Sequence, residues 1–199
     1  MQWKSIFVSI LALLFVSVSV PARSQVAHSA SEGRLPLTVG FGVSDYFLDW
    51  GNSRNMVGIT AWADWRLQHM PWFLNGIGIE VEGHHIAYNR PTELVRMQQD
   101  SGLGGVNYQW RHYDRVQPYG KALAGFGSID FPPFPKSNYS HDTRTILAMG
   151  AGADIHAWRR VSVRADYEYQ FWRHIFGPND LNPNGFTVGA VYDFGRRNY

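Results

Sequence analysis

The clearest pattern in this chain is a strict alternation of apolar and polar residues near its C-terminal end. In the segment Gly185–Phe194, every second residue from Phe186 onward is apolar, and Thr187 and Asp193 are among the residues between them. Because successive side chains of a β-strand point to opposite faces, this period of two predicts a strand with one apolar and one polar side.

The same alternation recurs along the chain and predicts eight strands. They are Leu37–Phe47, Met56–Leu67, Leu74–Ala87, Leu103–Tyr113, Pro118–Ile129, Thr143–His156, Val161–Trp172 and Gly185–Phe194. The connections alternate in length, with short turns at 69–72, 114–117 and 157–160 and longer loops at Tyr88–Ser101, Phe131–Asp142 and Arg173–Asn184. Short turns at one end and longer loops at the other are typical of small outer-membrane barrels.

Alternation does not decide which face lies inside, since a soluble barrel can have the same period with an apolar interior. Three features favour the membrane. The polar faces mix glycine with charges of both signs, which suits a narrow, filled interior. Tyrosine and tryptophan lie towards strand ends, where membrane interfaces would be, and lysine occurs only as Lys4, Lys121 and Lys136. We therefore predict an all-β fold, an eight-stranded antiparallel up-and-down transmembrane β-barrel, with a soluble exported ligand-binding barrel as the alternative.

The N-terminal residues have the composition of an export signal. A short basic start precedes the apolar run Ile6–Val20, and Ala22-Arg23-Ser24 has the small-x-small pattern of a cleavage site. We expect cleavage after Ser24, or alternatively after Ala22, which divides the chain into a signal peptide, 1–24, and a barrel domain, 25–199. The apolar run is shorter than the roughly 20 residues of a spanning helix.

Composition narrows the possible partners. Removal of residues 1–24 takes away Lys4 and Arg23 and lowers the formal net charge from +2 to zero, so charge gives no reason to expect a nucleic-acid partner. The chain has no cysteine, so an exported domain of this kind would depend on barrel closure rather than on disulfides.

The charged residues of the polar faces predict a polar network inside the lumen, the interior of the barrel. Its predicted members are Arg66, Glu80, Glu82, Arg111, Arg164, Asp166 and Glu168. Glu80, Glu82 and His84 share one strand face and could instead form a metal or acid–base site. We favour the network, because carboxylates of like charge in a barrel interior need cationic partners.

Neither a metal nor a catalytic site is predicted. His84 and His85 are neighbours on a strand and point to opposite faces, so they cannot jointly bind one ion. Outer-membrane lipid hydrolases place histidine and serine two residues apart on one strand, and no predicted strand here has that spacing. Ser140 and His141 are adjacent and fall in a predicted loop. We therefore expect no catalytic residues, no cofactor and no enzyme activity.

Two stretches near the C-terminus resemble a known family. The segments 161–172 and 182–194, together with 118–125, are similar to the OmpA/OmpX-like porin-type barrel domains of bacterial outer membranes. The resemblance implies an outer-membrane location, contact with lipid and lipopolysaccharide, and assembly by machinery that recognises a C-terminal aromatic residue. Phe194 or Tyr199 would serve as that signal.

The resemblance covers almost the whole barrel domain but specifies the fold rather than an activity. We expect a monomeric protein with a structural or surface-interaction role, whose longer loops face outward from the cell. The alternative is a narrow channel for small solutes, although an eight-stranded interior is normally filled by side chains.

Overall fold

The computed structural model describes residues 36–48, 54–67, 71, 74–88, 97–110, 115–130, 141–175 and 179–195. All of them belong to one compact unit, Arg34–Tyr199. The strands are β1 (Leu37–Leu48), β2 (Arg54–Arg66), β3 (Ile77–Tyr88), β4 (Met97–Gln109), β5 (Val116–Asp130), β6 (His141–Trp158), β7 (Val161–Ile175), β8 (Asn179–Leu181) and β9 (Asn184–Asp193). The predicted signal peptide lies outside the described residues.

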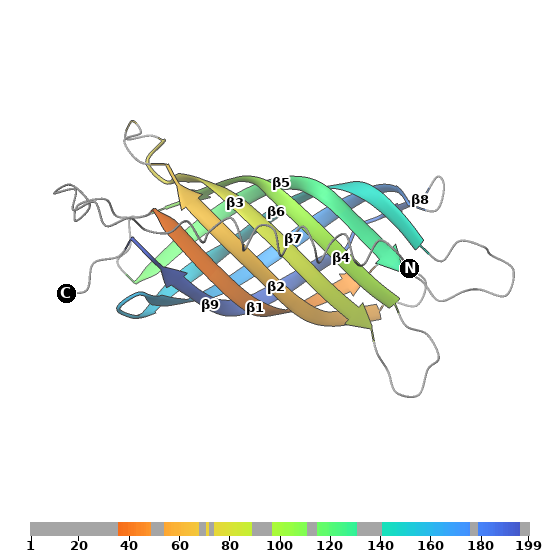
Figure 1. Cartoon of the computed structure of the whole chain (residues 1–199), viewed down its shortest axis with the longest axis horizontal. Coiled ribbons are helices and arrows are strands. Elements are labelled where there is room, and N and C mark those ends of the chain that lie inside the picture. Colours follow the sequence, from red (N-terminus) through yellow and green to blue (C-terminus); the bar gives the residue numbers. More distant parts are fainter. Residues whose placement is uncertain are drawn as a thin grey trace, which may run out of the picture. The chain divides into compact units, whose positions relative to one another are not determined.

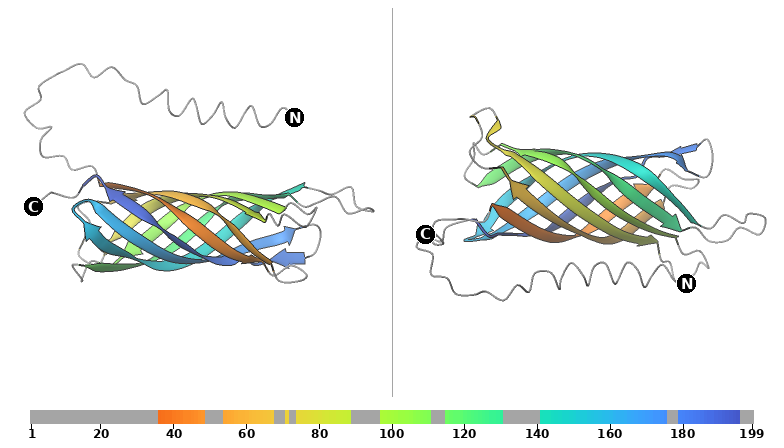
Figure 2. Two further views of the ribbon diagram at one scale, coloured as in Figure 1. Left: turned by 90° about the horizontal axis from the view of Figure 1, so that it is seen from below. Right: turned by 45° about the horizontal axis from the view of Figure 1, so that its top comes forward.

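Eight of these strands close into one antiparallel ring. Each strand from β1 to β7 pairs with the next, and β9 lies between β7 and β1 (Figure 1; Figure 2). The short strand β8 pairs only with the end of β7. We call the end of the ring that carries Leu37 and Asp193 the terminal end, and the end that carries Leu48 and Asn184 the loop end. The predicted eight-stranded up-and-down barrel is confirmed.

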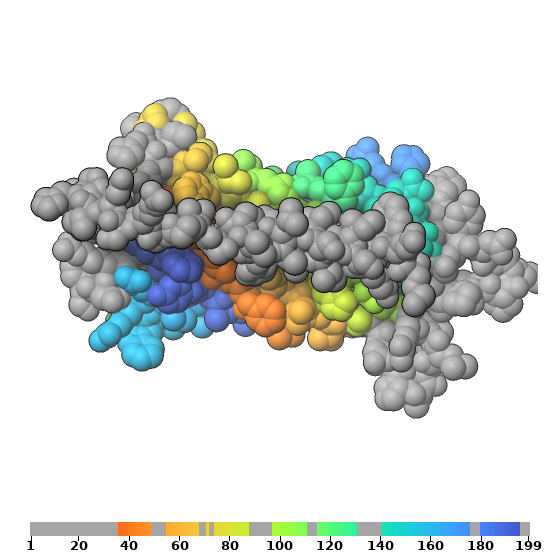
Figure 3. Space-filling model, viewed as in Figure 1, coloured from red at the N-terminus to blue at the C-terminus, as the bar shows by residue number. Residues whose placement is uncertain are grey.

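The outward face is apolar along the middle of the barrel. Val81 and Met149 are each at least 60% exposed. Where the described strands are visible in the space-filling view, side chains of neighbouring strands lie next to one another (Figure 3). No helix among the described residues is long and apolar enough to cross a membrane. The apolar side of the predicted strands therefore faces outward, and a soluble barrel with an apolar interior does not fit this structure.

Aromatic side chains flank the apolar band. The exposed aromatic residues towards the terminal end are Trp65, Trp110, Trp158, Tyr192 and Phe194, and those towards the loop end are Phe47, Phe126, Tyr167, Phe171 and Phe186. Aromatic girdles of this kind mark the two interfaces of a transmembrane barrel. The band between them is therefore the part that lies in the bilayer.

The strands extend further at the loop end than the alternation predicts. β4 begins at Met97, within the loop expected at 88–101, and β6 begins at His141, at the end of the loop expected at 131–142. β7 continues to Ile175, and β8 lies within the loop expected at 173–184. These three loop boundaries were wrong.

The predicted strand ends were misplaced because the apolar and polar residues exchange faces at the loop end. In β7, Trp172 and Ile175 are buried and Arg173 is exposed, whereas in the membrane band the apolar residues point outward. Beyond the bilayer a barrel must turn its polar side to water, so its apolar residues move inside. A search for continuous alternation in one phase therefore ends the strand too early.

An apolar cluster fills the lumen at the loop end. Its largest side chains are fully buried, and they come from strands all around the ring. The cluster consists of Tyr46, Leu48, Met56, Ile86, Met97, Leu103, Leu123, Ile129, Ile146, Ala148, Trp172, Ile175 and Leu181. We call it the apolar plug. It separates the polar part of the lumen from the loop end.

Candidate functional site: the polar lumen

Below the apolar plug, the lumen is filled by buried charged and polar side chains arranged around two cations. The first cation is Arg164, on β7. Its Nε lies 2.7 Å from Oδ1 of Asp154, and its Nη2 lies 2.8 Å from Oδ2 of Asp64. Its guanidinium carbon is 4.5 Å from the centre of the Tyr119 ring. Arg164 thus links β7 to β6 and β2 and also stacks against an aromatic face.

The second cation is Lys121, on β5. Its Nζ lies 2.5 Å from Oε2 of Glu82, 2.8 Å from Oδ2 of Asp166 and 2.9 Å from Oε2 of Glu168. One ammonium group thus contacts carboxylates from β3 and β7, on opposite sides of the ring. All four side chains are at most 3% exposed, so neither partner can be removed without leaving a buried charge unpaired.

Uncharged groups complete the network. Asn107 donates hydrogen bonds from Nδ2 to Asp64 and to Glu80, at 2.8 and 2.9 Å. Gln109 donates to Asp154, and the hydroxyl of Tyr119 donates to Asp166. The bonds to Asp64, Glu80 and Asp166 satisfy carboxylate oxygens that the two cations do not contact. The bond from Gln109 goes to Asp154 Oδ2, which Arg164 also contacts.

Negative charge exceeds positive charge in this region. Two buried cations, Lys121 and Arg164, are present among the described residues. The buried carboxylates of the described residues are Asp64, Glu80, Glu82, Asp154, Asp166 and Glu168. The lumen is therefore an environment that favours an additional positive charge.

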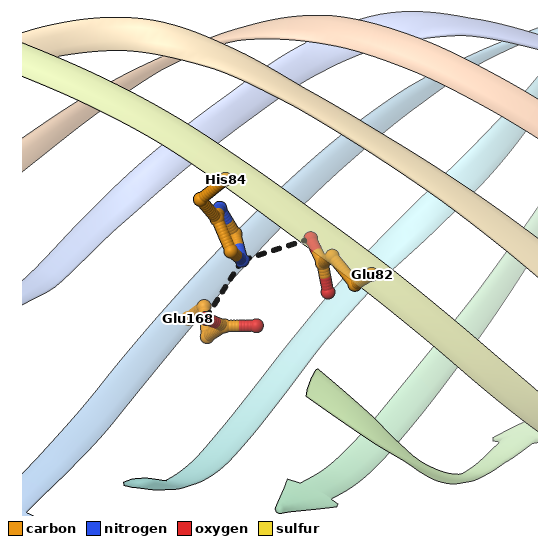
Figure 4. A group of neighbouring side chains, drawn as sticks. All are labelled: Glu82, His84 and Glu168. Carbon is orange, nitrogen blue, oxygen red and sulfur yellow. Dashed lines mark ion pairs between the residues drawn. The ribbon is translucent and has the colours of Figure 1, made fainter. Parts of the chain in front are cut away.

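A histidine lies between two of these carboxylates. Nε2 of His84 is 3.5 Å from Oε1 of Glu82 and 3.4 Å from Oε1 of Glu168 (Figure 4). The two glutamates use their other oxygens, Oε2, to contact Lys121. Glu168 Oε1 also accepts hydrogen bonds from the Tyr46 hydroxyl and the Gln170 amide.

The opposite nitrogen of His84 faces a row of hydroxyl groups. Nδ1 lies 2.9 Å from Oγ1 of Thr60, which in turn contacts Oγ of Ser44. Ser44 Oγ lies 2.8 Å from Oγ1 of Thr187. This row runs across β2, β1 and β9 and fixes the orientation of the imidazole ring.

The structure places most, but not all, of the residues predicted for the lumenal network around the two cations. Glu80, Glu82, Arg164, Asp166 and Glu168 are all buried around the two cations. Arg66 is only half-buried, near the terminal end, and Arg111 lies outside the described residues.

Some members of the network were absent from the predicted set. Lys121, Asp64 and Asp154 are central to it. All three fall on the polar face of their predicted strands, and this position is the signal that could have included them.

At the loop end, the outward surface carries a serine, a histidine and an aspartate. His141 lies in β6 rather than in the loop that the sequence predicted. Its Nδ1 is 2.5 Å from Oδ1 of Asp130, and Oγ of Ser128 lies 3.4 Å from the same Nδ1 and 3.3 Å from Nε2. An activated serine needs a directed bond to the nitrogen that the carboxylate does not engage. Because Ser128 is equally far from both nitrogens, this group does not have the geometry of a nucleophilic triad.

Comparison with known proteins identifies the family. The model of the outer membrane protein beta-barrel domain family matches residues 8–194. The chain belongs to this family. Membership places this β-barrel protein in the bacterial outer membrane and confirms the resemblance inferred from the strand sequences. No curated protein matches the chain in sequence.

Solved structures agree on the fold. Neisserial surface protein A is 16% identical, with a TM-score of 0.66, over 82% of this chain and all of that chain. Ail, the attachment invasion locus protein of Yersinia pestis, is 21% identical, with a TM-score of 0.57, over 79% of this chain and 97% of that one. At these identities the similarity shows a shared barrel and not a shared activity.

Proposed function

We propose that this protein is a closed, monomeric anchor in the outer membrane, without catalytic activity, whose loop end interacts with molecules outside the cell. The observation that carries the proposal is the apolar plug. Leu48, Ile129 and Trp172 are fully buried across the loop end of the lumen, and the two ion clusters fill the lumen below them. A barrel filled in this way provides a rigid support and no open water path.

The orientation of the barrel follows from its connections. In outer-membrane barrels the short turns lie in the periplasm and the longer loops outside, so the terminal end would face the periplasm. The segments 89–96, 131–140 and 176–178 lie outside the described residues and belong to the loops that would meet a partner. Two similar proteins are named as a surface protein and as an attachment invasion protein, which supports a surface role for this one.

The outer rim, by which we mean the outward-facing polar residues at the loop end, also supports contact with lipopolysaccharide. Outward-facing His85 lies 2.5 Å from Asp100, and outward-facing His141 pairs with Asp130 in the same way. Both pairs lie on the outward surface towards the loop end, and we propose that they lie at the level of the lipid headgroups. Polar side chains at this level would contact headgroups, while the apolar band contacts acyl chains.

Conductance in planar lipid bilayers tests whether the lumen is closed. We expect the folded protein to show no discrete openings under conditions in which a general porin, added as a positive control, conducts. The alternative function is a narrow channel, and the excess of buried carboxylates would make such a channel selective for cations. Discrete openings whose size or selectivity changes in Glu82→Ala and Arg164→Ala would contradict a closed anchor and support the channel.

A further inference from the structure

We propose that Glu82, His84 and Glu168 bind one divalent transition-metal ion, with zinc-like coordination, inside the lumen. Each of the three residues offers one ligand atom, and these atoms lie within 4.8 Å of one another (Figure 4). His84 Nε2 is nearest to Oε1 of each glutamate. This site adds a function to the polar network and does not depend on any surface role of the protein.

The two distances from His84 Nε2 to the glutamate oxygens fit a metal better than they fit hydrogen bonds. Nε2 makes no hydrogen bond in the described part of the chain, although the His84 side chain is fully buried. Its separations from the two carboxylate oxygens, 3.4 and 3.5 Å, exceed the usual N–H···O length of about 2.7–3.2 Å. Two ligands bound to one tetrahedral ion at about 2.0–2.2 Å are separated by about 3.3–3.6 Å.

The surroundings of His84 prepare Nε2 to bind a cation. Thr60 contacts the opposite nitrogen, Nδ1, at 2.9 Å. When Nδ1 donates its hydrogen to the Thr60 hydroxyl, Nε2 keeps a lone pair that points at two carboxylate oxygens. In this tautomer, a cation between the lone pair and the two carboxylates makes the arrangement favourable. In a metal-binding histidine, the ring nitrogen that does not bind the metal usually makes a hydrogen bond.

Lys121 does not compete for the same atoms. It contacts Oε2 of Glu82 and Oε2 of Glu168, whereas the proposed site uses Oε1 of both. The excess of carboxylates in the lumen means that the ion would reduce an existing charge imbalance rather than create one.

The donor atoms indicate which metal fits. One imidazole and two carboxylates suit Zn²⁺, Co²⁺ and related ions, whereas Mg²⁺ prefers an all-oxygen set and retains its water. Glu82 and His84 are on β3 and Glu168 is on β7, and three strands separate β3 from β7 in either direction around the ring. A bound ion would therefore connect opposite walls of the barrel.

The test is metal binding by the full chain folded in detergent micelles, with and without metal present during folding. We expect one tightly bound Zn²⁺ per chain by elemental analysis, no comparable binding of Mg²⁺, and Co²⁺ absorption bands typical of four-coordination. Thermal unfolding should shift to a higher temperature with Zn²⁺, because an ion that binds only the folded state stabilises it.

Matched variants distinguish a specific site from general negative charge. Glu82→Gln and His84→Gln should weaken Zn²⁺ binding by at least about tenfold. Glu80→Gln neutralises a carboxylate that is equally buried on the same strand but leaves the three ligands in place, so its binding should stay close to that of the unmodified chain. The difference in gel mobility between unboiled and boiled samples shows whether each variant is folded.

Two results would overturn the proposal. One is an unmodified chain that binds Zn²⁺ no better than Mg²⁺ and whose unfolding temperature Zn²⁺ does not change, a result that needs no variant. The other is a loss of binding in Glu80→Gln equal to the loss in Glu82→Gln, which would show that charge alone attracts the ion. Neither result bears on whether the barrel conducts ions.

Discussion

At the scale of single residues, the lumen is packed so closely that some positions require glycine for lack of space. A Cβ atom added at Gly40 would lie 2.3 Å from the ring of Trp62, which is itself buried. The outward-facing Gly102 has no atom within 4 Å of such a Cβ. The two glycines therefore form a matched pair, one facing the filled lumen and one facing outward.

We expect Gly40→Ala to lower the free energy of unfolding by about 1–3 kcal/mol, because the extra methyl group overpacks the lumen. Gly102→Ala should be neutral or raise it by about 0.5–1 kcal/mol, since alanine loses less backbone entropy than glycine. Urea unfolding in lipid vesicles, followed by tryptophan fluorescence, measures both changes. Equal effects of the two substitutions would contradict a filled lumen.

At the scale of a strand, β6 passes from the polar rim through the apolar band. Met149 lies near its middle and is 62% exposed, whereas Thr143 lies at its loop end beside the polar residues of the rim. Both side chains point outward, so the position along the strand decides whether each one meets acyl chains or headgroups.

A charge placed at these two positions tests the location of the apolar band. We expect Met149→Arg to lower the free energy of unfolding by about 2–4 kcal/mol and Thr143→Arg by about 0–1 kcal/mol, because the cost of burying arginine falls towards the interface. The same unfolding assay applies to both variants. If Thr143→Arg proved as costly as Met149→Arg, the band would extend further towards the loop end than the exposed residues indicate.

At the scale of the whole molecule, closure of the ring depends on its last strand. Phe194 follows β9, and its backbone N–H donates a 3.0 Å hydrogen bond to the carbonyl of Leu37 at the start of β1. Its side chain is exposed and packs edge-to-face against Tyr192. Tyr199, the other aromatic residue that could act as the assembly signal, lies outside the described residues.

We expect Phe194→Ala to reduce the amount of folded protein in the outer membrane several-fold, because the assembly machinery would lose the exposed aromatic side chain that it recognises after the last strand. A chain that ends after Gly195, and so lacks Tyr199, should accumulate normally. Membrane fractionation with unboiled and boiled gel samples measures folded protein in each case. Loss of the truncated chain with retention of Phe194→Ala would assign the signal to Tyr199 instead.

The sequence by itself determined the features of this protein that depend on residues close together along the chain. The outward positions of β9 and β7 could be predicted because strand geometry fixes a period of two, and the bilayer requires apolar side chains at every second position. The number of strands in the ring followed from the same local pattern. At the loop end the prediction failed, because the polar and apolar sides exchange faces where the barrel leaves the membrane.

Only the tertiary structure decided which of the lumenal residues contact one another. Lys121 is separated from Glu82 and Glu168 by long stretches of sequence, and no local pattern indicates that one ammonium group contacts both. The placement of His84 between these two glutamates likewise depends on closure of the ring, which sets β3 opposite β7. Periodicity identifies the residues that face the lumen, whereas strand order and register determine which of them meet.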